Sequence, residues 1–364
     1  MESLVEKKLF NGEYKGKNVL VTGHTGFKGS WLCLWLTQMG ANVTGYSKDF
    51  PGEPNHFKLL DLDMNSVIAD IRDKDKLFEI FNQTKPEIVF HMAAQPLVRY
   101  SYKNPIETYE TNVMGTLNVF EACRNIDSVK AIVNITSDKC YENKEWVWGY
   151  RENDPMGGYD PYSSSKGCAE LITTSYRNSF FNVKDYGQNH NVLLASGRAG
   201  NVIGGGDWAE DRLIPDIMRA IAKGEKVIIR NPNATRPWQH VLEPLSGYLL
   251  VGQKLLEGKT EFAQAWNFGP GDEANLRVVD VLTMMKKEWD MIEFEIQSNE
   301  NQPHEAGLLK LDCSKAHFIL KWKNVWDNEM TFKKTVEWYE QYYVSKHLTS
   351  ILNLSNYISC VKKG

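Results

Sequence analysis

Short apolar runs alternate with stretches that can form helices along the first part of the chain. Runs of this length are typical of strands that are buried on both faces of a sheet. They cover residues 18–22, 42–46, 66–69, 87–92, 130–135 and 191–196. Strands that are separated by helices pair in parallel and form a doubly wound sheet. The pattern therefore predicts an α/β fold with a Rossmann-type parallel sheet over residues 1–200.

The pattern changes after Arg198. Residues 198–215, RAGNVIGGGDWAEDRLIP, are rich in glycine, and we expect a site-forming loop with no regular element. Short elements and loops alternate beyond it, which predicts a smaller, discontinuous α/β substrate domain over residues 201–345. We expect residues from about 238 to 270 to contribute to the first domain as well. Residues 346–364 form a predicted tail whose role the sequence leaves open.

A glycine-rich turn follows the first predicted strand. In GHTGFKG, Gly23, Gly26 and Gly29 have the spacing GxxGxxG, and a helical stretch begins at about Gly26. Glycine lets the backbone approach a pyrophosphate closely, and the start of a helix supplies free N–H groups and a partial positive charge. The succession of strand, turn and helix predicts a dinucleotide-binding site, although a glycine-rich turn can also occur without a ligand.

Two cationic side chains lie within this turn. His24 and Lys28 would add attraction for the dianionic pyrophosphate if their side chains faced it. The alternative is that both are solvated turn residues, and the sequence favours neither possibility.

The residues expected around the adenosine half of a dinucleotide depart from the usual pattern. An acidic residue normally follows the second strand and binds the ribose hydroxyls, but here Ser47 is followed by Lys48 and Asp49. This position therefore does not secure a preference for NAD over NADP. Asp70, after the third run, either hydrogen-bonds the adenine amino group or caps a helix that begins near Arg72.

Chemically active side chains follow the fifth predicted strand. TSDKCY places Ser137, Asp138 and Lys139 where this buried strand should end. Downstream, YSSSK puts Tyr162 and Lys166 four residues apart, on one face of a predicted helix. A nearby ammonium group favours the phenolate, so the pair predicts a lowered tyrosine pKa and a base that acts near neutral pH.

Five motifs occur together in this chain. They are GxxGxxG at 23–29, HMAAQ at 91–95, Asn112 in TNVMGT, TSD at 136–138 and the Tyr162/Lys166 pair. In combination they resemble the extended short-chain dehydrogenase/reductases that act on nucleotide sugars, and the resemblance extends to about residue 340. Three longer strings, GHTGFKGSWL, TSDKCY and RAGNVIGGGDWAEDRLIPD, are similar to the CDP-glucose 4,6-dehydratases within that superfamily. The resemblance implies an NAD-dependent lyase with CDP-glucose as its substrate.

The resemblance also implies a set of cofactor contacts. Ala93 and Ala94 would line the cofactor groove, and Asn112 would steady the central sheet. The NAD-binding set that we expect comprises Gly23, His24, Gly26, Phe27, Lys28, Gly29, Ser47, Asp70, Ile71, Ala93, Ala94, Gln95, Asn112, Tyr162 and Lys166.

On the substrate side, the resemblance implies that Ser137 assists Tyr162 at the sugar 4-hydroxyl. The further nucleotide-sugar contacts that it implies are Asn201, Arg212, Arg236 and Asn267. Arginine suits a diphosphate because its planar fork donates two hydrogen bonds at once. The alternative for each arginine is a surface ion pair.

A 4,6-dehydratase removes water across carbons 5 and 6 of its sugar, which requires an acid and a base. We expect Asp138 to be the acid for the departing 6-hydroxyl, provided that burial keeps its proton in place near neutral pH. Lys139 is the expected base for the carbon 5 proton, a role that it can fill only when neutral. The other interpretation makes Lys139 a cation that stabilises the enolate, with another group as the base.

Two other functions fit the same fold. A nucleotide-sugar 4-epimerase shares the glycine turn and the YxxxK pair, but it needs no Asp/Lys pair for elimination. A non-catalytic NAD(P)-binding regulator needs no catalytic side chains, so the presence together of Ser137, Asp138, Tyr162 and Lys166 disfavours it.

The composition sets the class and compartment that we expect. A hydrophobic fraction of 42%, a charged fraction of 24% and a net charge of −4 disfavour a disordered chain or a nucleic-acid partner. The six cysteines form no CxxC pair, which predicts reduced thiols and no metal site. We find no signal-peptide core or membrane-length apolar run, so we expect a cytoplasmic protein. In the superfamily, helices at about 105–123 and 162–178 pair with a second copy, which implies a homodimer.

Overall fold

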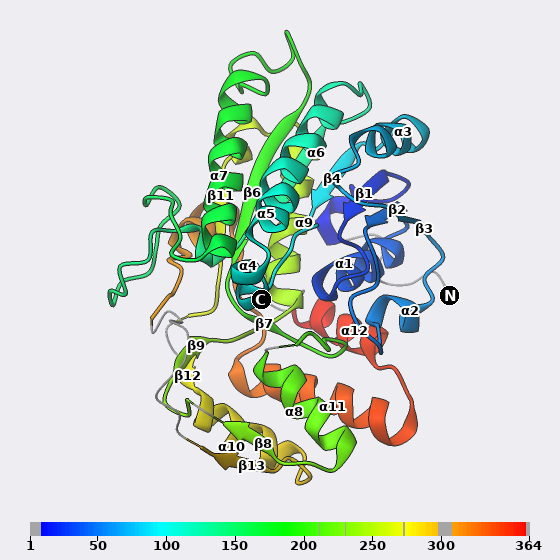
Figure 1. The fold of residues 1–364 in the computed structure, drawn as a ribbon. Coiled ribbons are helices and arrows are strands. Elements are labelled where there is room, and N and C mark those ends of the chain that lie inside the picture. Colours follow the sequence, from blue (N-terminus) through cyan, green and yellow to red (C-terminus); the bar gives the residue numbers. More distant parts are fainter. Residues whose placement is uncertain (1–8, 211, 230, 272–273, 298–307, 362–364) are drawn as a thin grey trace.

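The computed structural model (Figure 1) describes residues 9–210, 212–229, 231–271, 274–297 and 308–361. Residues 1–8, where we expect no signal peptide, and residues 362–364 of the predicted tail lie outside these ranges.

A seven-stranded parallel sheet forms the centre of the larger part of the molecule. Its strand order is β11-β6-β5-β4-β1-β2-β3, and every neighbouring pair is parallel. The predicted doubly wound α/β fold is therefore confirmed. The strands are β1 (Asn18–Thr22), β2 (Asn42–Ser47), β3 (Asn65–Ile68), β4 (Ile88–His91), β5 (Ala131–Ile135), β6 (Leu193–Ala199) and β11 (Ala265–Phe268).

Side chains of the central strands alternate between two apolar cores, one on each face of the sheet, whereas the edge strand β3 is largely exposed. In β1, Val19 and Val21 pack into one core and Leu20 packs into the other. This alternation explains why the central strands are continuous apolar runs, because neither face meets water. The covering helices are α1 (Phe27–Gln38) and α9 (Leu242–Leu256) on the first face and α3 (Lys74–Thr84), α6 (Gly115–Arg124) and α7 (Pro161–Ser179) on the second.

Shorter helices and turns connect these elements. Asp138–Cys140, the turn η3, follows β5 directly and carries part of the predicted active site. The others are η1 (Leu9–Gly12), α2 (His56–Leu60), α4 (Val98–Lys103), α5 (Pro105–Tyr109), η2 (Glu110–Met114), η4 (Thr260–Phe262) and η6 (Ala316–Leu320).

The stretch 198–215 is more regular than we expected. β6 continues to Ala199, a short strand pairs in parallel with another from beyond the stretch, and a helix begins before the stretch ends, so the prediction of no regular element is wrong. Pro215 does not prevent that helix, because the N–H of a first-turn residue needs no intrahelical partner. The three elements are β7 (Val202–Ile203), β10 (Gln239–His240) and α8 (Leu213–Lys223).

A smaller part of the molecule lies below the sheet in Figure 1. It contains α8 with two short strand pairs, β8 with β13 in parallel and β9 with β12 antiparallel. Between these elements the chain returns to the larger part of the molecule and forms α9 and β11 there. The predicted limits of the two domains stay a prediction. Its remaining elements are β8 (Val227–Ile229), β9 (Thr235–Pro237), β12 (Asn275–Arg277), α10 (Val278–Glu288), β13 (Phe294–Ile296) and α11 (Asn328–Ser345).

Most of the predicted tail is a helix that belongs to the core. α12 (Ser350–Val361) buries Leu354, Tyr357 and Ile358. The ring of Tyr357 meets that of Trp35 in α1 edge to face, with the ring centroids 5.7 Å apart. The end of the chain thus closes the face of the sheet that α1 covers.

A buried carboxylate fastens α12 in place. The hydroxyl of Tyr357 donates to Oε2 of Glu243 at 2.8 Å. The same carboxylate accepts hydrogen bonds from the backbone N–H groups of Val325 and Trp326. Burial raises the pKa of the Glu243 carboxyl to about 7, although these donors oppose the shift. Each donor therefore offsets part of the cost of burying a charge.

Three further findings concern membrane-spanning helices, metal sites and cysteines. Within the described ranges, no helix is both long and apolar enough to cross a bilayer. No group of three His, Cys, Asp or Glu side chains in the same ranges is arranged to hold a metal ion. The six cysteines are unpaired, and those at 33, 123, 140 and 313 are buried.

Replacing Tyr357 with phenylalanine should destabilise the protein by about 1–3 kcal/mol, because a buried carboxylate loses one of its donors. The measurement is the midpoint of urea unfolding. Ser359→Ala on the exposed side of the same helix is the control, with an expected change below about 0.5 kcal/mol. Equal midpoints for the two variants would contradict the proposed role of the Tyr357–Glu243 hydrogen bond.

Candidate active site

A large cleft crosses the carboxyl ends of the parallel strands. It encloses about 980 Å³, and the loops after β1 to β6 form one wall while the smaller part of the molecule forms the other. Ligands of open α/β sheets bind at this edge, where the strand order turns from β1 to β4. Most predicted site residues line the cleft: Gly23, Gly26, Phe27, Lys28, Gly29, Ser47, Asp70, Ile71, Ala93, Ala94, Gln95, Ser137, Asp138, Lys139, Tyr162, Lys166, Asn201, Arg212 and Arg236.

The glycine turn fits a pyrophosphate. Gly23 has φ +78°, and a Cβ there would lie 2.8 Å from the backbone nitrogen of Ala93. A Cβ on Gly29 would overlap the carbonyl oxygen of Gly23, so α1 can approach the turn only with glycine at this position. Gly26 precedes α1 and provides no side-chain cap for it, which leaves N–H groups of the first helical turn for an anion.

His24 does not fill the cationic role that we considered. Its buried ring lies between two hydroxyls, with Nδ1 2.9 Å from Oγ of Ser47 and Nε2 2.7 Å from Oγ of Ser66. Burial lowers the His24 pKa to about 4, so the ring is neutral at pH 7 and packs behind the turn. Lys28 does line the cleft, and burial lowers its pKa to about 8, which leaves it mostly charged at pH 7.

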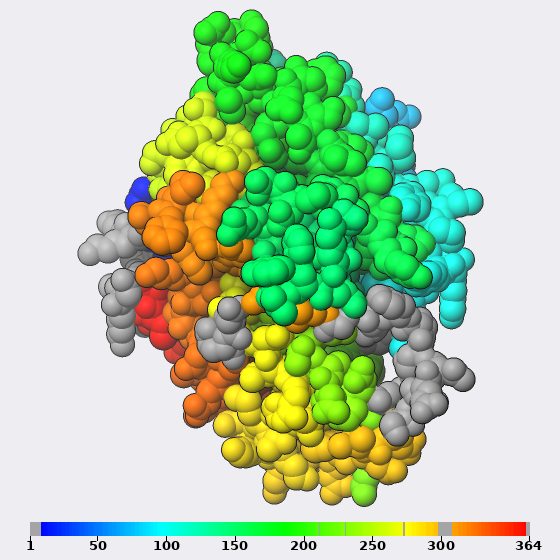
Figure 2. Space-filling view, turned by 90° about the vertical axis from the view of Figure 1, so that its left-hand side faces the viewer, coloured from blue at the N-terminus to red at the C-terminus, as the bar shows by residue number. Residues whose placement is uncertain are grey.

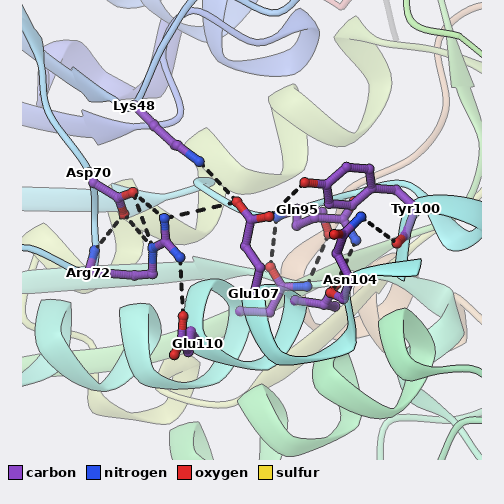
Figure 3. Close-up of polar contacts among 10 residues, drawn as sticks. Lys48, Asp70, Arg72, Gln95, Tyr100, Asn104, Glu107 and Glu110 are labelled. Carbon is purple, nitrogen blue, oxygen red and sulfur yellow. Dashed lines mark hydrogen bonds and ion pairs between the residues drawn. The ribbon is translucent and has the colours of Figure 1, made fainter. Parts of the chain in front are cut away.

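The adenosine end of the cleft is crowded with paired side chains (Figure 3). The Ser47 hydroxyl makes its hydrogen bonds within the protein. Besides its contact with His24, it accepts a hydrogen bond from the N–H of Thr25 at 3.2 Å. Asp70 binds the guanidinium of Arg72, with Oδ2 2.7 Å from Nη2. The side chain that caps α3 is Asp73, so the reading of Asp70 as that cap is wrong. A contact between Asp70 and adenine stays a prediction.

Asn112 lies behind the cleft and joins two of its walls. Its amide exchanges two hydrogen bonds with the backbone of Gln95, at 2.8 and 3.0 Å, and donates to Oγ of Ser165 at 2.8 Å. Ser165 belongs to α7, between Tyr162 and Lys166. Asn112 therefore ties the loop after β4 to the helix that carries the YxxxK pair, which is more specific than the predicted support of the sheet.

The turn η3 and the start of α7 bring the expected chemical groups into one place. Oγ of Ser137 donates to Oδ1 of Asp138 at 2.9 Å and accepts a hydrogen bond from the N–H of Lys139 at 3.2 Å. Tyr162 and Lys166, one helical turn apart in α7, line the same cleft. A hydroxyl, a carboxyl, two amines and a phenol therefore surround a single space.

Burial decides the protonation of the acidic groups at this point. It raises the Asp138 pKa, although the positive charge of Lys139 and the hydrogen bond from Ser137 act in the opposite direction. It also raises the Tyr162 pKa to about 12, with the Ser137 hydrogen bond lowering it in part. The expectation of a lowered tyrosine pKa is therefore wrong for this state of the protein, because the loss of water outweighs nearby cations.

A buried ion pair that our sequence analysis missed supports the turn η3. Nη2 of Arg198 lies 2.7 Å from Oε2 of Glu170, with the side chains 3% and 1% exposed. The hydroxyl of Thr136 donates to Oε1 of Glu170 at 2.5 Å. Nη1 of Arg198 donates to the hydroxyl of Tyr141 at 2.7 Å. Glu170 lies four residues beyond Lys166 on α7. This spacing places Glu170 on the same face of the helix as the YxxxK pair, and it is the feature of the sequence that could have indicated a role for Glu170 near the site.

The segment that follows η3 is fastened to a distant stretch of chain. Residues 141–160 lie on the surface beside residues 308–325 (Figure 2). The backbone N–H of Tyr150 donates to the carbonyl of Lys310 at 2.9 Å, and the N–H of Asp312 donates to the carbonyl of Tyr150 at 2.8 Å. This pairing holds the outer wall behind the catalytic turn.

The smaller part contributes arginines to the cleft. Arg212 lines it while Nη1 pairs with Oδ2 of Asp207 at 3.0 Å, and Arg236 and Asn201 line it as well. Asn267 does not reach the cleft. Its side chain is fully buried and binds the hydroxyl of Tyr141 and two backbone carbonyls, so its predicted contact with substrate is wrong.

The chain matches the family model described as GDP-mannose 4,6 dehydratase over residues 20–336. A CDP-glucose 4,6-dehydratase of Salmonella typhimurium is 55% identical over 354 residues, which cover 96% of this chain and 98% of the relative. The chain belongs to the GDP-mannose 4,6 dehydratase family. Membership of this family agrees with the motifs at the glycine turn, the end of β5 and α7.

Solved structures of proteins with low sequence identity have the same fold as this chain. The UDP-glucose 4-epimerase from Brucella ovis in complex with NAD has a TM-score of 0.74 at 21% identity and covers 88% of this chain and 97% of its own. The dTDP-glucose 4,6-dehydratase from Bacillus anthracis in complex with NAD has a TM-score of 0.71 at 21% identity and covers 89% and 96%. Both likenesses concern the fold.

Replacing Arg198 with methionine should cost about 3–5 kcal/mol of stability, because Glu170 would remain as a buried, unpaired carboxylate. The double variant Arg198→Met with Glu170→Leu should recover a large part of this loss, since no buried charge is left. Urea unfolding of both variants measures the difference. A double variant no more stable than the single one would contradict this account of the pair.

Proposed function

We propose that the protein is a CDP-glucose 4,6-dehydratase, which converts CDP-D-glucose to CDP-4-keto-6-deoxy-D-glucose and water. The observation that carries the proposal is the convergence of Ser137, Asp138, Lys139, Tyr162 and Lys166 on one cleft. The 55% identity to the Salmonella typhimurium enzyme over nearly the full length of both chains supports CDP-glucose as the substrate.

The cofactor is NAD, which when bound accepts a hydride from carbon 4 of the sugar and later returns it to carbon 6. The turn at Gly23 and the start of α1 would hold its pyrophosphate, since a side chain at Gly23 or Gly29 would close this space. Lys28 adds a positive charge beside the turn, and Ala93 and Ala94 leave room along the groove. Two solved relatives of the same fold carry NAD, which supports this assignment.

Tyr162 takes the proton from the sugar 4-hydroxyl. Because burial raises its pKa, the phenolate needs stabilisation inside the cleft. Ser137 supplies a hydrogen bond to it when its hydroxyl hydrogen turns from Asp138 to the phenolate, and Lys166 supplies a positive charge from the next turn of α7. Oxidation at carbon 4 then acidifies the proton on carbon 5, which prepares the elimination.

Asp138 and Lys139 carry out the elimination. Burial raises the Asp138 pKa and thereby helps this carboxyl to keep the proton that it donates to the departing 6-hydroxyl. Lys139 takes the carbon 5 proton, a role that requires Lys139 to have lost its own proton before this step. The C5–H and C6–O bonds break, a C5=C6 double bond forms, and the 6-hydroxyl leaves as water. When the hydride returns to carbon 6, Lys139 gives the proton back to carbon 5. An epimerase has no use for such a pair, so its position in the cleft favours the dehydratase.

We further propose a cytoplasmic homodimer. The helical stretch from α5 to α6 and the outer side of α7 expose large apolar side chains, with Ile106 74%, Met114 49% and Leu171 60% exposed. A second copy of the chain would cover them, as the predicted pairing of these helices requires. The unpaired cysteines fit a reducing compartment.

Incubation of the purified protein with CDP-glucose and a catalytic amount of NAD should yield a 4-keto-6-deoxy product without net consumption of the cofactor, because NAD is regenerated in each turnover. Parallel incubations with dTDP-glucose and GDP-mannose should give far less product. Mass spectrometry detects the loss of water from the nucleotide sugar. If none of the three compounds reacts, the proposed function is wrong.

Lys139→Met should reduce turnover at least ~100-fold, because it removes the base of the elimination. Exchange of the carbon 5 proton with deuterated solvent should disappear in the same variant. Lys139→Arg separates the two possible roles, since arginine keeps the charge but does not accept a proton at neutral pH. If exchange of the carbon 5 proton survives in the arginine variant, Lys139 is not the base, and its role is that of a cation that stabilises the enolate. Lys144→Met, on the surface, is the control with normal exchange.

A further inference from the structure

The adenosine end of the cleft contains a cluster of paired charges, shown in Figure 3. We call it the adenosine-pocket cluster and define it as Lys48, Asp70, Arg72, Tyr100 and Glu107. Lys48 follows β2, Asp70 and Arg72 follow β3, and Tyr100 and Glu107 belong to α4 and α5. Lys48, Asp70, Tyr100 and Glu107 line the cleft.

Glu107 is the centre of this cluster. Its Oε1 accepts a hydrogen bond from Nζ of Lys48 at 2.9 Å, and its Oε2 accepts one from the Tyr100 hydroxyl at 2.6 Å. These two hydrogen bonds hold the Glu107 pKa below its usual value, and the bond to Glu107 raises the Lys48 pKa. Both partners are therefore charged at neutral pH, and the lysine is neutralised by a carboxylate that is itself held in place.

The second cation of the cluster is also paired. Arg72 donates to both oxygens of Asp70, at 3.0 Å from Nε to Oδ1 and 2.7 Å from Nη2 to Oδ2. Its Nη1 donates to Glu110 at 3.1 Å, and Nη2 lies 3.9 Å from Oε1 of Glu107. The two cations of the cluster are thus each paired with a carboxylate of the cluster, Lys48 with Glu107 and Arg72 with Asp70, while Glu110 binds Arg72 from outside the cleft.

The position of the cluster gives it a role in cofactor choice. In this fold the residue after the second strand lies at the adenosine ribose, where an acid selects NAD and a free cation binds the 2′-phosphate of NADP. Here Lys48 occupies that region and would by itself favour the phosphate. Because Glu107 pairs with Lys48, an incoming phosphate dianion would meet an ion pair with no net charge in place of a free cation.

We propose that Glu107 is a specificity-determining residue, which makes the protein select NAD over NADP by pairing with Lys48. The acid that normally follows the second strand is thus replaced by one from α5, far along the chain. The proposal rests on the proposed function in taking the cofactor to be a nicotinamide dinucleotide.

The test is the binding of NADH and NADPH to Glu107→Gln, followed by the fluorescence of the reduced nicotinamide. Glutamine keeps the shape of the side chain and removes its charge, which frees Lys48. The preference for NADH over NADPH, taken as the ratio of dissociation constants, should fall at least about tenfold from that of the unmodified protein. A ratio that does not change would overturn the proposal.

Two further variants separate the proposed pairing from a general effect of charge. Lys48→Met with Glu107→Gln should lose the gain in NADPH affinity, because the freed cation is absent. Glu110→Gln removes a carboxylate that pairs with Arg72 outside the cleft, and it should leave the ratio close to that of the unmodified protein. A gain in NADPH affinity that persists without Lys48, or that Glu110→Gln reproduces, would also overturn the proposal.

Failure of this inference can be distinguished from failure of the proposed function. If the unmodified protein binds neither NADH nor NADPH, the cofactor assignment is wrong and the inference falls with it. If it binds NADH and turns over CDP-glucose while Glu107→Gln keeps the same preference, the inference alone is wrong.

Discussion

The ion pair between Glu170 and Arg198 is the interaction on which the geometry of the active site depends. It joins α7 to β6 in a place without water, and it reaches Thr136 at one end of the catalytic turn and Tyr141 at the other. The turn and the helix therefore share one buried support. Because breaking a buried pair leaves an uncompensated charge, this support resists displacement of either element. Tyr162 and Lys166 lie on the same helix and benefit from the same restraint.

Such a restraint suits the chemistry, which acts on three neighbouring carbon atoms of one sugar. An acid, a base and a phenol can serve carbons 4, 5 and 6 only if their relative positions stay constant to a fraction of an ångström. The sheet carries these groups, and the smaller part of the molecule carries Arg212 and Arg236, which suit a diphosphate. In the proposed function, recognition of the nucleotide and reaction at the sugar are thus assigned to different parts of the chain.

Features set by neighbouring residues could be predicted from the sequence. The strands, the turn at Gly23 and the grouping of Ser137 to Lys139 depend on local patterns, and the structure places them as expected. Features set by distant contacts could not. The ring of His24 is neutral because β2 and β3 enclose it, and the amide of Asn267 is used by residues far along the chain. Lys48 and Glu107 are 59 positions apart, so no local motif predicts their pairing.

The order of the elements along the chain has a consequence for synthesis on the ribosome. The two tryptophans of α1, Trp31 and Trp35, emerge early, whereas α9 and α12, which help to enclose this face, are made during and after the smaller part. The sheet also lacks its edge strand β11 until then. A growing chain therefore presents a broad aromatic surface until α9 and α12 have been made, the kind of surface that associates with other chains or is bound by chaperones. Docking of Tyr357 against Trp35 cannot occur before α12 has been made.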